Sequence, residues 1–417
     1  MLQVLRKSKQ LRGEHGSITI KKVLDRGYNE LQQLRLGRFE PEQRGWFGID
    51  DKVLIVNRWK ADNELLSYPS STEVYELARK LTREWGLYDE SDRHEVTFQS
   101  LVNGKSSVEI TRGIFKTPRE EQRLDEVLKE MVDEVSARMG LMPFYAGQDP
   151  AIEAKSYGHH VHFSAGSPLD TMLLYLEMRN DLWRATSFSA NSPLFNFDDE
   201  ESGDEPVLMC SRLGRTHVVK LCPPTYKVTD KSLKVMEPDE ISAKAYPLLI
   251  DNRTGTVEVR ASDIDVCSSA TVAYIVLLLH TRQRQIEQAR VVNIYDNNTI
   301  QWNMDQAKRY GLSDRGSVDV IVDGEAVDLP IQEEMKRHWE DEMLPTLQSL
   351  GGMEFIPEHV LEVIEERIYS GAIPAQRVVD EYSNTLARGH DRITALAAAQ
   401  EPNLFRAGNY FRDEIRD

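Results

Sequence analysis

Three histidines stand close together in the stretch Gly158–Phe163, whose alternating pattern is typical of a strand. Successive side chains of a strand point to opposite faces of a sheet, so His160 and His162 should project together while His159 points away. Two neighbouring imidazoles can bind a metal ion or contact a phosphate group. A surface strand that happens to carry histidines has the same pattern, and this stretch alone does not distinguish the two.

A second strand pattern, Gly255–Asp263, carries Glu258 and Arg260 two residues apart, so both should share one face. Taken alone, such a pair is most often a cross-strand surface ion pair. A short helix ends at Gly311 with Arg309 in its last turn, where a cation can simply stabilise the helix C-terminus. Each segment therefore has a structural interpretation beside a functional one.

Two further segments supply small polar residues and another arginine. Ser187–Pro193 closes a helix and contains Asn191 and Ser192, and Arg212 follows the acidic stretch Asp198–Glu205. The serine-rich turn could be no more than the exit of a helix, and the acidic stretch is most simply a solvated loop. The order of these segments along the chain is more informative than any one of them.

Length and composition describe a soluble globular protein of 417 residues, with 40% hydrophobic and 29% charged residues. A net charge of −17 argues against broad contact with nucleic acid or anionic lipid, although a local basic pocket could still bind an anionic substrate. Three cysteines without metal-ligand spacing fit a reducing cytoplasm. The longest apolar run, Val272–Leu279, is too short to span a bilayer, and no signal-peptide core is evident, so we expect a cytoplasmic protein without a membrane role.

Strand patterns cluster in the first two-thirds of the chain and helical patterns at its end. Strands are expected at Val53–Val56, Glu95–Leu101, Ser107–Thr111, Gly158–Phe163 and Thr256–Ala261. Helices are expected from Thr117 to Gly140, from Asp170 to Phe188 as an amphipathic helix, from Ser268 to Gln288 as a mostly buried one, and beyond Pro330 with breaks at Gly351-Gly352, Gly371 and Gly389. The absence of regular β-α alternation favours an α+β fold with a largely antiparallel sheet.

In this order, the segments resemble the motifs of the carboxylate–amine ligases related to bacterial glutamate–cysteine ligase. The family patterns are approximately G-x-H-V-H-V, L-S-A-N/A-S-P, S-R, G-T-V-E-V-R-x-x-D and A-x-R-Y-G-L. They correspond to Gly158–Phe163, Phe188–Pro193, Ser211-Arg212, Gly255–Asp263 and Ala307–Leu312, and a late S-G-x-x-x-A-Q pattern is echoed at Ser370–Gln376. Each motif is weak by itself, but five in register are fairly specific.

The resemblance implies an enzyme that activates a carboxylate with the γ-phosphate of ATP and then lets an amine displace phosphate from the acyl phosphate, with Mg²⁺ as cofactor. It implies a glutamine-synthetase-like fold, in which a curved, mainly antiparallel sheet forms a funnel with flanking helices. A single catalytic domain would cover residues 46–417, helical from about residue 330, after a peripheral extension at residues 1–45. Glutamate and cysteine are the substrates that the family suggests, and a homodimer is expected by analogy.

Positions within the motifs imply individual roles. Glu258 would bind the metal, and His160 would bind the metal or the γ-phosphate. Arg260 would face the phosphates or the substrate carboxylate, and Arg212 would be a second anion clamp, since guanidinium groups bind such oxygens bidentately. The other residues expected to contact ATP or substrate are His162, Asn191, Ser192 and Arg309.

Two lysines stand where the family has glutamates that bind magnesium. In the first strand of the family, G-I/V-E-x-E, Asp50 replaces the first glutamate and Lys52 the second. In a later E-x-x-x-E pattern, Lys105 occupies the first position and Glu109 the second. An ammonium group cannot bind magnesium and repels a nearby cation. Asp50 and Glu109 remain expected metal ligands, and both lysines are expected to contact ATP or substrate.

Three explanations of the lysines stay open. The local register could differ, with Asp50, Asp51 and Glu64 sharing the metal. The lysines could contact phosphate in place of one metal ion, or the site could be degenerate and the protein could bind or regulate a partner. A histidine-metal hydrolase is a more distant alternative, because acid/base partners at a credible spacing are missing. We therefore expect an ATP-dependent carboxylate–amine ligase, with a degenerate binding or regulatory protein as the alternative.

Overall fold

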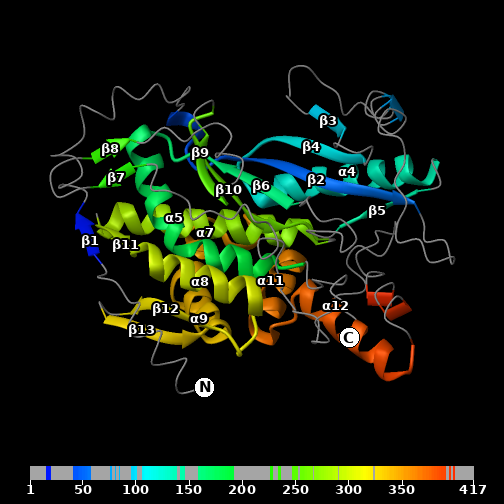
Figure 1. Ribbon diagram of the computed structural model, residues 1–417. Helices are drawn as coiled ribbons and strands as arrows, with labels where there is room; N and C mark the ends of the chain where they lie inside the picture. The colour runs from blue at the N-terminus through cyan, green and yellow to red at the C-terminus, as the bar shows by residue number, and fades with distance from the viewer. Residues whose placement is uncertain are drawn as a thin grey trace.

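A seven-stranded sheet and a layer of helices beneath it form the centre of the molecule (Figure 1). The computed structural model describes residues 16–19, 41–57, 95–100, 106–138, 141–145, 158–191, 226–228, 233–235, 247–251, 254–265, 267–289, 291–322 and 325–390, together with the single positions 76, 77, 80, 84, 394, 395, 398 and 399. Every structural statement below concerns these residues.

The large sheet has the strand order β3-β4-β2-β6-β10-β9, and β5 pairs with β2 beside this path. Its strands are β2 (Phe47–Asn57), β3 (Glu95–Ser100), β4 (Ser106–Phe115), β5 (Leu141–Phe144), β6 (Gly158–Phe163), β9 (Leu248–Asp251) and β10 (Thr256–Asp263). All neighbours run antiparallel, which confirms the predicted α+β class with a largely antiparallel sheet. The predicted curving of this sheet into a funnel is not seen: the described strands form a sheet that is neither curled nor closed.

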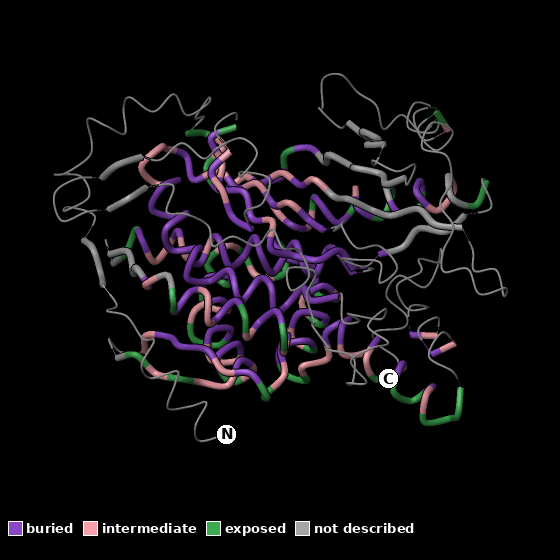
Figure 2. Tube along the Cα trace, viewed as in Figure 1, coloured by how far each residue is buried: buried purple, intermediate pink, exposed green. Residues whose placement is uncertain are grey.

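Two helices, α5 (Pro168–Ser189) and α7 (Ser268–Ala289), pack against each other beneath the sheet. The side chain of Ser167 caps the first turn of α5 by accepting the N–H of Asp170. Residues 171–189 of α5 are all buried, so the amphipathic helix expected here is instead surrounded by protein on every side (Figure 2). Helix α5 packs against α7, β9 and β10, and against α8 (Asn297–Tyr310).

The mostly buried helix predicted at residues 268–288 is confirmed by α7, in which Val272–Leu279 is buried without interruption. This stretch belongs to the hydrophobic core, and α7 packs against α4 (Pro118–Arg138), α5, α11 (Glu358–Ser370) and β6. Even so, none of the helices in the described parts of the chain combines the length and the apolar character needed to cross a lipid bilayer.

Further elements surround this centre. They are η1 (Pro41–Gln43), α4 (Pro118–Arg138), α8 (Asn297–Tyr310), α9 (Ile331–His338), η3 (Trp339–Met343), α10 (Leu344–Ser349), η4 (Gly352–Glu354), α11 (Glu358–Ser370) and α12 (Pro374–Ala387). Three two-stranded sheets pair β1 (Gly16–Thr19) with β11 (Val291–Ile294), β7 (Tyr226–Val228) with β8 (Leu233–Val235), and β12 (Ser317–Val322) with β13 (Glu325–Pro330). The pairing of β1 attaches this part of the predicted N-terminal extension to the fold.

The C-terminal region is helical from Ile331, as predicted. Its helices end where glycines adopt the left-handed conformation that other residues disfavour: Gly371, with φ of 73°, ends α11, and Gly389, with φ of 87°, follows α12. The helix that begins at Ile331 contains one irregularity, since η3 is a π-helix between α9 and α10.

Strand β10 contains one more residue than β6 where the two strands pair. Val259 faces Val161, but the next register partner of His159 is Ser262, so three steps along β10 match two steps along β6. Such a β-bulge bends the strand and changes the direction of the side chains that follow it. The bulge lies directly after Glu258 and Val259, next to the residues that the sequence singles out.

Candidate functional site

Strand alternation brings polar side chains together on the face of the sheet that is turned away from the helices. Asp50 is the register partner of His160, and His162 is the partner of Glu258. Phe163, which alternates with the histidines, points the other way and contacts the ring of His280 in α7 at 4.9 Å between centroids. We call Asp50, His160, His162, Glu258 and Arg260 the sheet-face cluster.

Glu258 is the centre of the sheet-face cluster. Its Oε1 lies 2.5 Å from Nε of Arg260 and 3.3 Å from Nδ1 of His160. The same oxygen lies 3.7 Å from Nε2 of His162, whose Nε2 is also 3.5 Å from Oδ2 of Asp50. The side chain of Glu258 is only 3% exposed, whereas that of Arg260 is 23% exposed. The carboxylate is therefore buried among groups that carry or can acquire positive charge.

His162 favours its protonated form in this setting. Burial lowers its pKa, but the hydrogen bond to Asp50 and the charges of Glu258, Asp50 and Asp251 outweigh burial, so the pKa lies above the ordinary value of 6.5. Nδ1 of His162 is 3.1 Å from Oγ1 of Thr256, which fixes the orientation of the ring. Thr256 was not singled out in the sequence, although its place at the start of β10 puts it beside the histidines.

Asn191 supports the chain behind this face and does not join the sheet-face cluster. It is fully buried, and its Nδ2 donates to the carbonyl oxygens of Tyr145 at 2.8 Å and Ile264 at 3.0 Å. Its backbone N–H donates to Oδ2 of Asp263 at 2.9 Å. These bonds join three segments of the chain, so the described contacts of Asn191 are with protein groups. Its expected contact with ATP or substrate stays a prediction.

Arg309 also lies apart from the sheet-face cluster. It is exposed in the last turn of α8, and its guanidinium carbon is 5.7 Å from the centroid of the Tyr310 ring. Helix α8 packs against α5 and β12, on the side of the helix layer that is turned away from the sheet (Figure 1). The structure therefore does not bring Arg309 to the residues with which the motifs associate it.

The remaining predicted residues are placed only in part. Lys105, Ser192 and Arg212 lie outside the described residues. The backbone register makes Lys52 of β2 the direct partner of Glu109 of β4, two residues along from the pair formed by Asp50 and Thr111. Lys52, which replaces a glutamate of the family pattern, and Glu109, which keeps one, therefore occupy directly opposite positions on neighbouring strands.

The described residues do not complete a metal site. Within the described parts of the chain, no group of three or more histidine, cysteine, aspartate or glutamate side chains is arranged to hold a metal ion. Arg260 occupies Oε1 of Glu258, and two carboxylates with two imidazoles offer fewer oxygen ligands than magnesium prefers. The expected metal roles of Asp50, Glu109, His160 and Glu258 therefore stay predictions.

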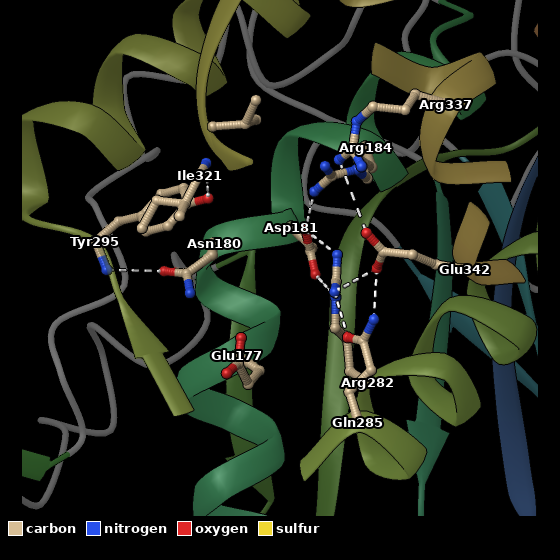
Figure 3. Close-up of a pocket in the computed structure, with 11 residues that line it drawn as sticks. Glu177, Asn180, Asp181, Arg184, Arg282, Gln285, Tyr295, Ile321, Arg337 and Glu342 are labelled. Carbon is tan, nitrogen blue, oxygen red and sulfur yellow. Dashed lines mark hydrogen bonds and ion pairs between the residues drawn. The ribbon is translucent and has the colours of Figure 1, made fainter. Parts of the chain in front are cut away.

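A second polar site, which sequence reasoning missed, lies inside the helix layer. A cavity of about 380 Å³ opens between α5, α7, β12 and η3 (Figure 3). We call it the arginine pocket; its charged lining residues are Glu177, Asp181, Arg184, Arg282, Arg337 and Glu342. The signal that could have revealed it is the run of charged residues within α5, a helix that packs beside the wholly apolar stretch of α7.

The charges around the arginine pocket are paired. Arg184 and Arg282 both bind Asp181, and Nη1 of Arg282 lies 2.8 Å from Oε2 of Glu342. Burial by itself would raise the pKa of Asp181, but Arg282 and Arg184 hold it below its ordinary value. The same balance lowers the pKa of Glu342, where Arg282 is the strongest opposing charge. These groups are therefore ionised around neutral pH.

No protein-family model and no curated protein matches the sequence. The structure is similar to the crystal structure of the complex between the prokaryotic ubiquitin-like protein Pup and its ligase PafA, with a TM-score of 0.53 and 13% sequence identity over 87% of this chain and 74% of that chain. This similarity shows that the chain shares the fold of PafA. The narrower resemblance to glutamate–cysteine ligase gains no support from these comparisons.

Proposed function

We propose that the protein is an ATP-dependent ligase that joins a carboxylate to an amine through an acyl phosphate. The observation that carries this proposal is the convergence of His160, Glu258 and Arg260 on one face of the sheet, although β6 and β10 are far apart in the sequence. The fold shared with the ligase PafA supports it.

The proposed reaction has two steps. An oxygen of the substrate carboxylate attacks the γ-phosphorus of ATP, and ADP leaves. The amine nitrogen then attacks the acyl carbon and releases a proton to solvent, and inorganic phosphate leaves with the electrons of the broken C–O bond. Both steps move negative charge onto phosphate oxygens, which fixed cations stabilise. Arg260 suits this role because its partly exposed guanidinium group can exchange Glu258 for a phosphate oxygen, and protonated His162 adds a second donor.

ATP and Mg²⁺ belong to this proposal through the fold and the motifs. When bound, magnesium would neutralise part of the triphosphate charge, and Asp50, Glu109 and Glu258 are the carboxylates that we expect around it. Glutamate is the proposed carboxylate substrate and cysteine the first amine to test. Because PafA is named as the ligase of Pup, a carboxylate carried by a protein also belongs in the test.

The test is an assay of the purified full-length protein with ATP, Mg²⁺ and a panel of acids and amines, including glutamate, cysteine and acidic peptides. We expect ADP release that depends on the acid, and an amide product detectable by mass spectrometry. Arg260→Gln should lower kcat about 100-fold or more, as the loss of a donor to developing charge does in other enzymes. The matched control, Arg309→Gln, removes an exposed arginine outside the sheet-face cluster and should leave kcat within about twofold.

A specific result would favour the degenerate alternative, which is motivated by Lys52 and Lys105. If a non-hydrolysable ATP analogue binds in calorimetry and Arg260→Gln weakens that binding, yet no acid in the panel causes ADP release, the protein binds nucleotide without ligation. If no analogue binds and no ADP appears, the proposal of a nucleotide site on this face is wrong.

A further inference from the structure

The arginine pocket is a recess in the helix layer that is partly open to solvent, since the side chains of Arg337 and Glu342 in its lining are both partly exposed. A cavity of about 380 Å³ is within the usual range of sites for small ligands. Its walls come from α5, α7, α9, η3, β12 and the segment after β11, all of which lie beneath the large sheet (Figure 1).

The pocket is lined by equal numbers of carboxylate and guanidinium groups, and two of opposite charge stand at different positions along α5. Glu177 and Arg184 lie two helical turns apart on one side of α5, which corresponds to about 10 Å along the helix axis. Arg337 of α9 stands at the Arg184 end, because both guanidinium groups bind Glu334. The pocket therefore has a carboxylate towards one end and two guanidinium groups towards the other (Figure 3).

Arg184 retains a donor that protein atoms do not use. Its side chain is 5% exposed, and its Nη1 and Nη2 bind Asp181 and Glu334. Its Nε, by contrast, is buried without a hydrogen-bond partner. Buried N–H groups are hydrogen-bonded in nearly all native structures. A carboxylate in the pocket would be such a partner.

The π-helix η3 forms one wall of the pocket. It lies within an otherwise α-helical segment from Ile331 to Ser349 and contributes Glu342 to the lining. Glu342 is held by Nη1 of Arg282 at 2.8 Å and by Nε2 of Gln285 at 2.6 Å, and its side chain is 20% exposed. Single π-helical turns inside α-helices are uncommon and frequently occur at functional sites.

We propose that the arginine pocket binds a small zwitterion of the free amino acid class, with the ligand carboxylate at Arg184 and Arg337 and the ligand ammonium group at Glu177. A lining of three guanidinium and three carboxylate groups gives no net attraction to a simple anion or a simple cation. A molecule that carries both charges at its two ends matches it. The site is separate from the sheet-face cluster and does not depend on the proposed ligase activity.

Calorimetry on the full-length protein, with each of the twenty standard amino acids as titrant, tests this proposal. We expect at least one amino acid to bind with a stoichiometry near one, while succinate and putrescine, which carry only one kind of charge, do not bind the pocket. Glu177→Gln and Arg337→Gln should each raise Kd about tenfold or more. Glu258→Gln, in the sheet-face cluster, should leave Kd unchanged, which separates this site from a substrate site.

The proposal is overturned if no amino acid binds the wild-type protein, or if binding is lost in Glu258→Gln and kept in Glu177→Gln. Hydrogen exchange on the wild-type protein provides a second measurement that needs no variant. The bound amino acid should slow exchange in α9 and η3 without slowing it in β6 and β10. Protection confined to β6 and β10 would place the ligand on the sheet and contradict the proposal.

Discussion

The sheet-face cluster and the arginine pocket contain the same kinds of side chain in different surroundings. In the sheet-face cluster, Arg260 is 23% exposed and Asp50 26% exposed, and two histidines lie beside Glu258. In the arginine pocket, Asp181 is 3% exposed and binds two permanently charged guanidinium groups. The side chains of the sheet-face cluster can therefore exchange their protein partners for a ligand, whereas those of the arginine pocket are largely held in place before any ligand binds.

The largest expected effect comes from removing one arginine from each site. Arg184→Met should lower the free energy of unfolding by about 3 kcal/mol, because it leaves Asp181 and Glu334 each with one buried cation fewer. Arg260→Met should lower it by about 1 kcal/mol or less, since the arginine is partly exposed and Glu258 keeps its contact with His160. Urea denaturation of both variants measures the difference.

Equal losses in the two variants would remove the distinction between an adjustable and a fixed site. A stabilising effect of Arg184→Met would contradict it as well, because it would show that the buried ion pairs oppose folding. Arg309→Met, which removes an exposed cation outside both sites, is the matched control and should change stability by less than about 0.5 kcal/mol.

A smaller effect is expected at Asn191, which supports the sheet-face cluster from behind. Asn191→Ala removes the donors to the carbonyl groups of Tyr145 and Ile264, and leaves both acceptors in a buried place. Stability should fall by about 2 kcal/mol. If Asn191 acts only through structure, KM for ATP and acid should stay within about twofold at temperatures where the variant is folded. A large rise in KM with unchanged stability would instead restore the predicted contact with substrate.

A pH dependence of opposite sign is expected for two histidines. The pKa of His162 is raised, so its contribution to stability is fully present below about pH 6.5 and is lost as the pH rises through the raised value. Burial lowers the pKa of His280 to about 4, so stability falls as the pH drops from 6.5 towards 4. Proton NMR titration of the ring C–H signals measures both values.

His162→Gln provides the control for this pH dependence. The part of the stability change that occurs above pH 6.5 should disappear in this variant, while the loss at acid pH should remain. A ring signal of His162 that titrates at or below 6.5 would show that Asp50 and Glu258 do not hold its proton.

Sequence reasoning could predict the sheet-face cluster because its geometry follows from local rules. A period of two puts His160 with His162, and Glu258 with Arg260, on common faces without knowledge of the rest of the chain. What it could not supply is the register that sets Glu258 opposite His162, because pairing between distant strands depends on the whole fold. The family resemblance supplied the order of the motifs, but it also grouped Arg309 with residues from which the structure separates it.

The arginine pocket escaped prediction because its residues meet only in three dimensions. Asp181 and Arg282 are 101 residues apart, and Arg282 and Glu342 are 60 residues apart. Within α5, charged residues at this spacing predict a solvent-facing side of an amphipathic helix. In the structure these charges face α7 and α9, where Asp181 binds Arg282 and Arg184 binds Glu334, so they are buried and paired with one another.

The additional residue in β10 has a consequence for variants and relatives of this protein. Strict alternation would place Ser262 beside Glu258 and Arg260, but the bulge sets it opposite His159 instead, where its hydroxyl group donates to the carbonyl oxygen of that histidine. Deleting a single amino acid there would reverse the orientation of everything downstream in the strand, including Asp263. In a relative of this protein, a gap of one position in this strand would therefore change the site more than several substitutions would, because it determines which side chains face a bound molecule.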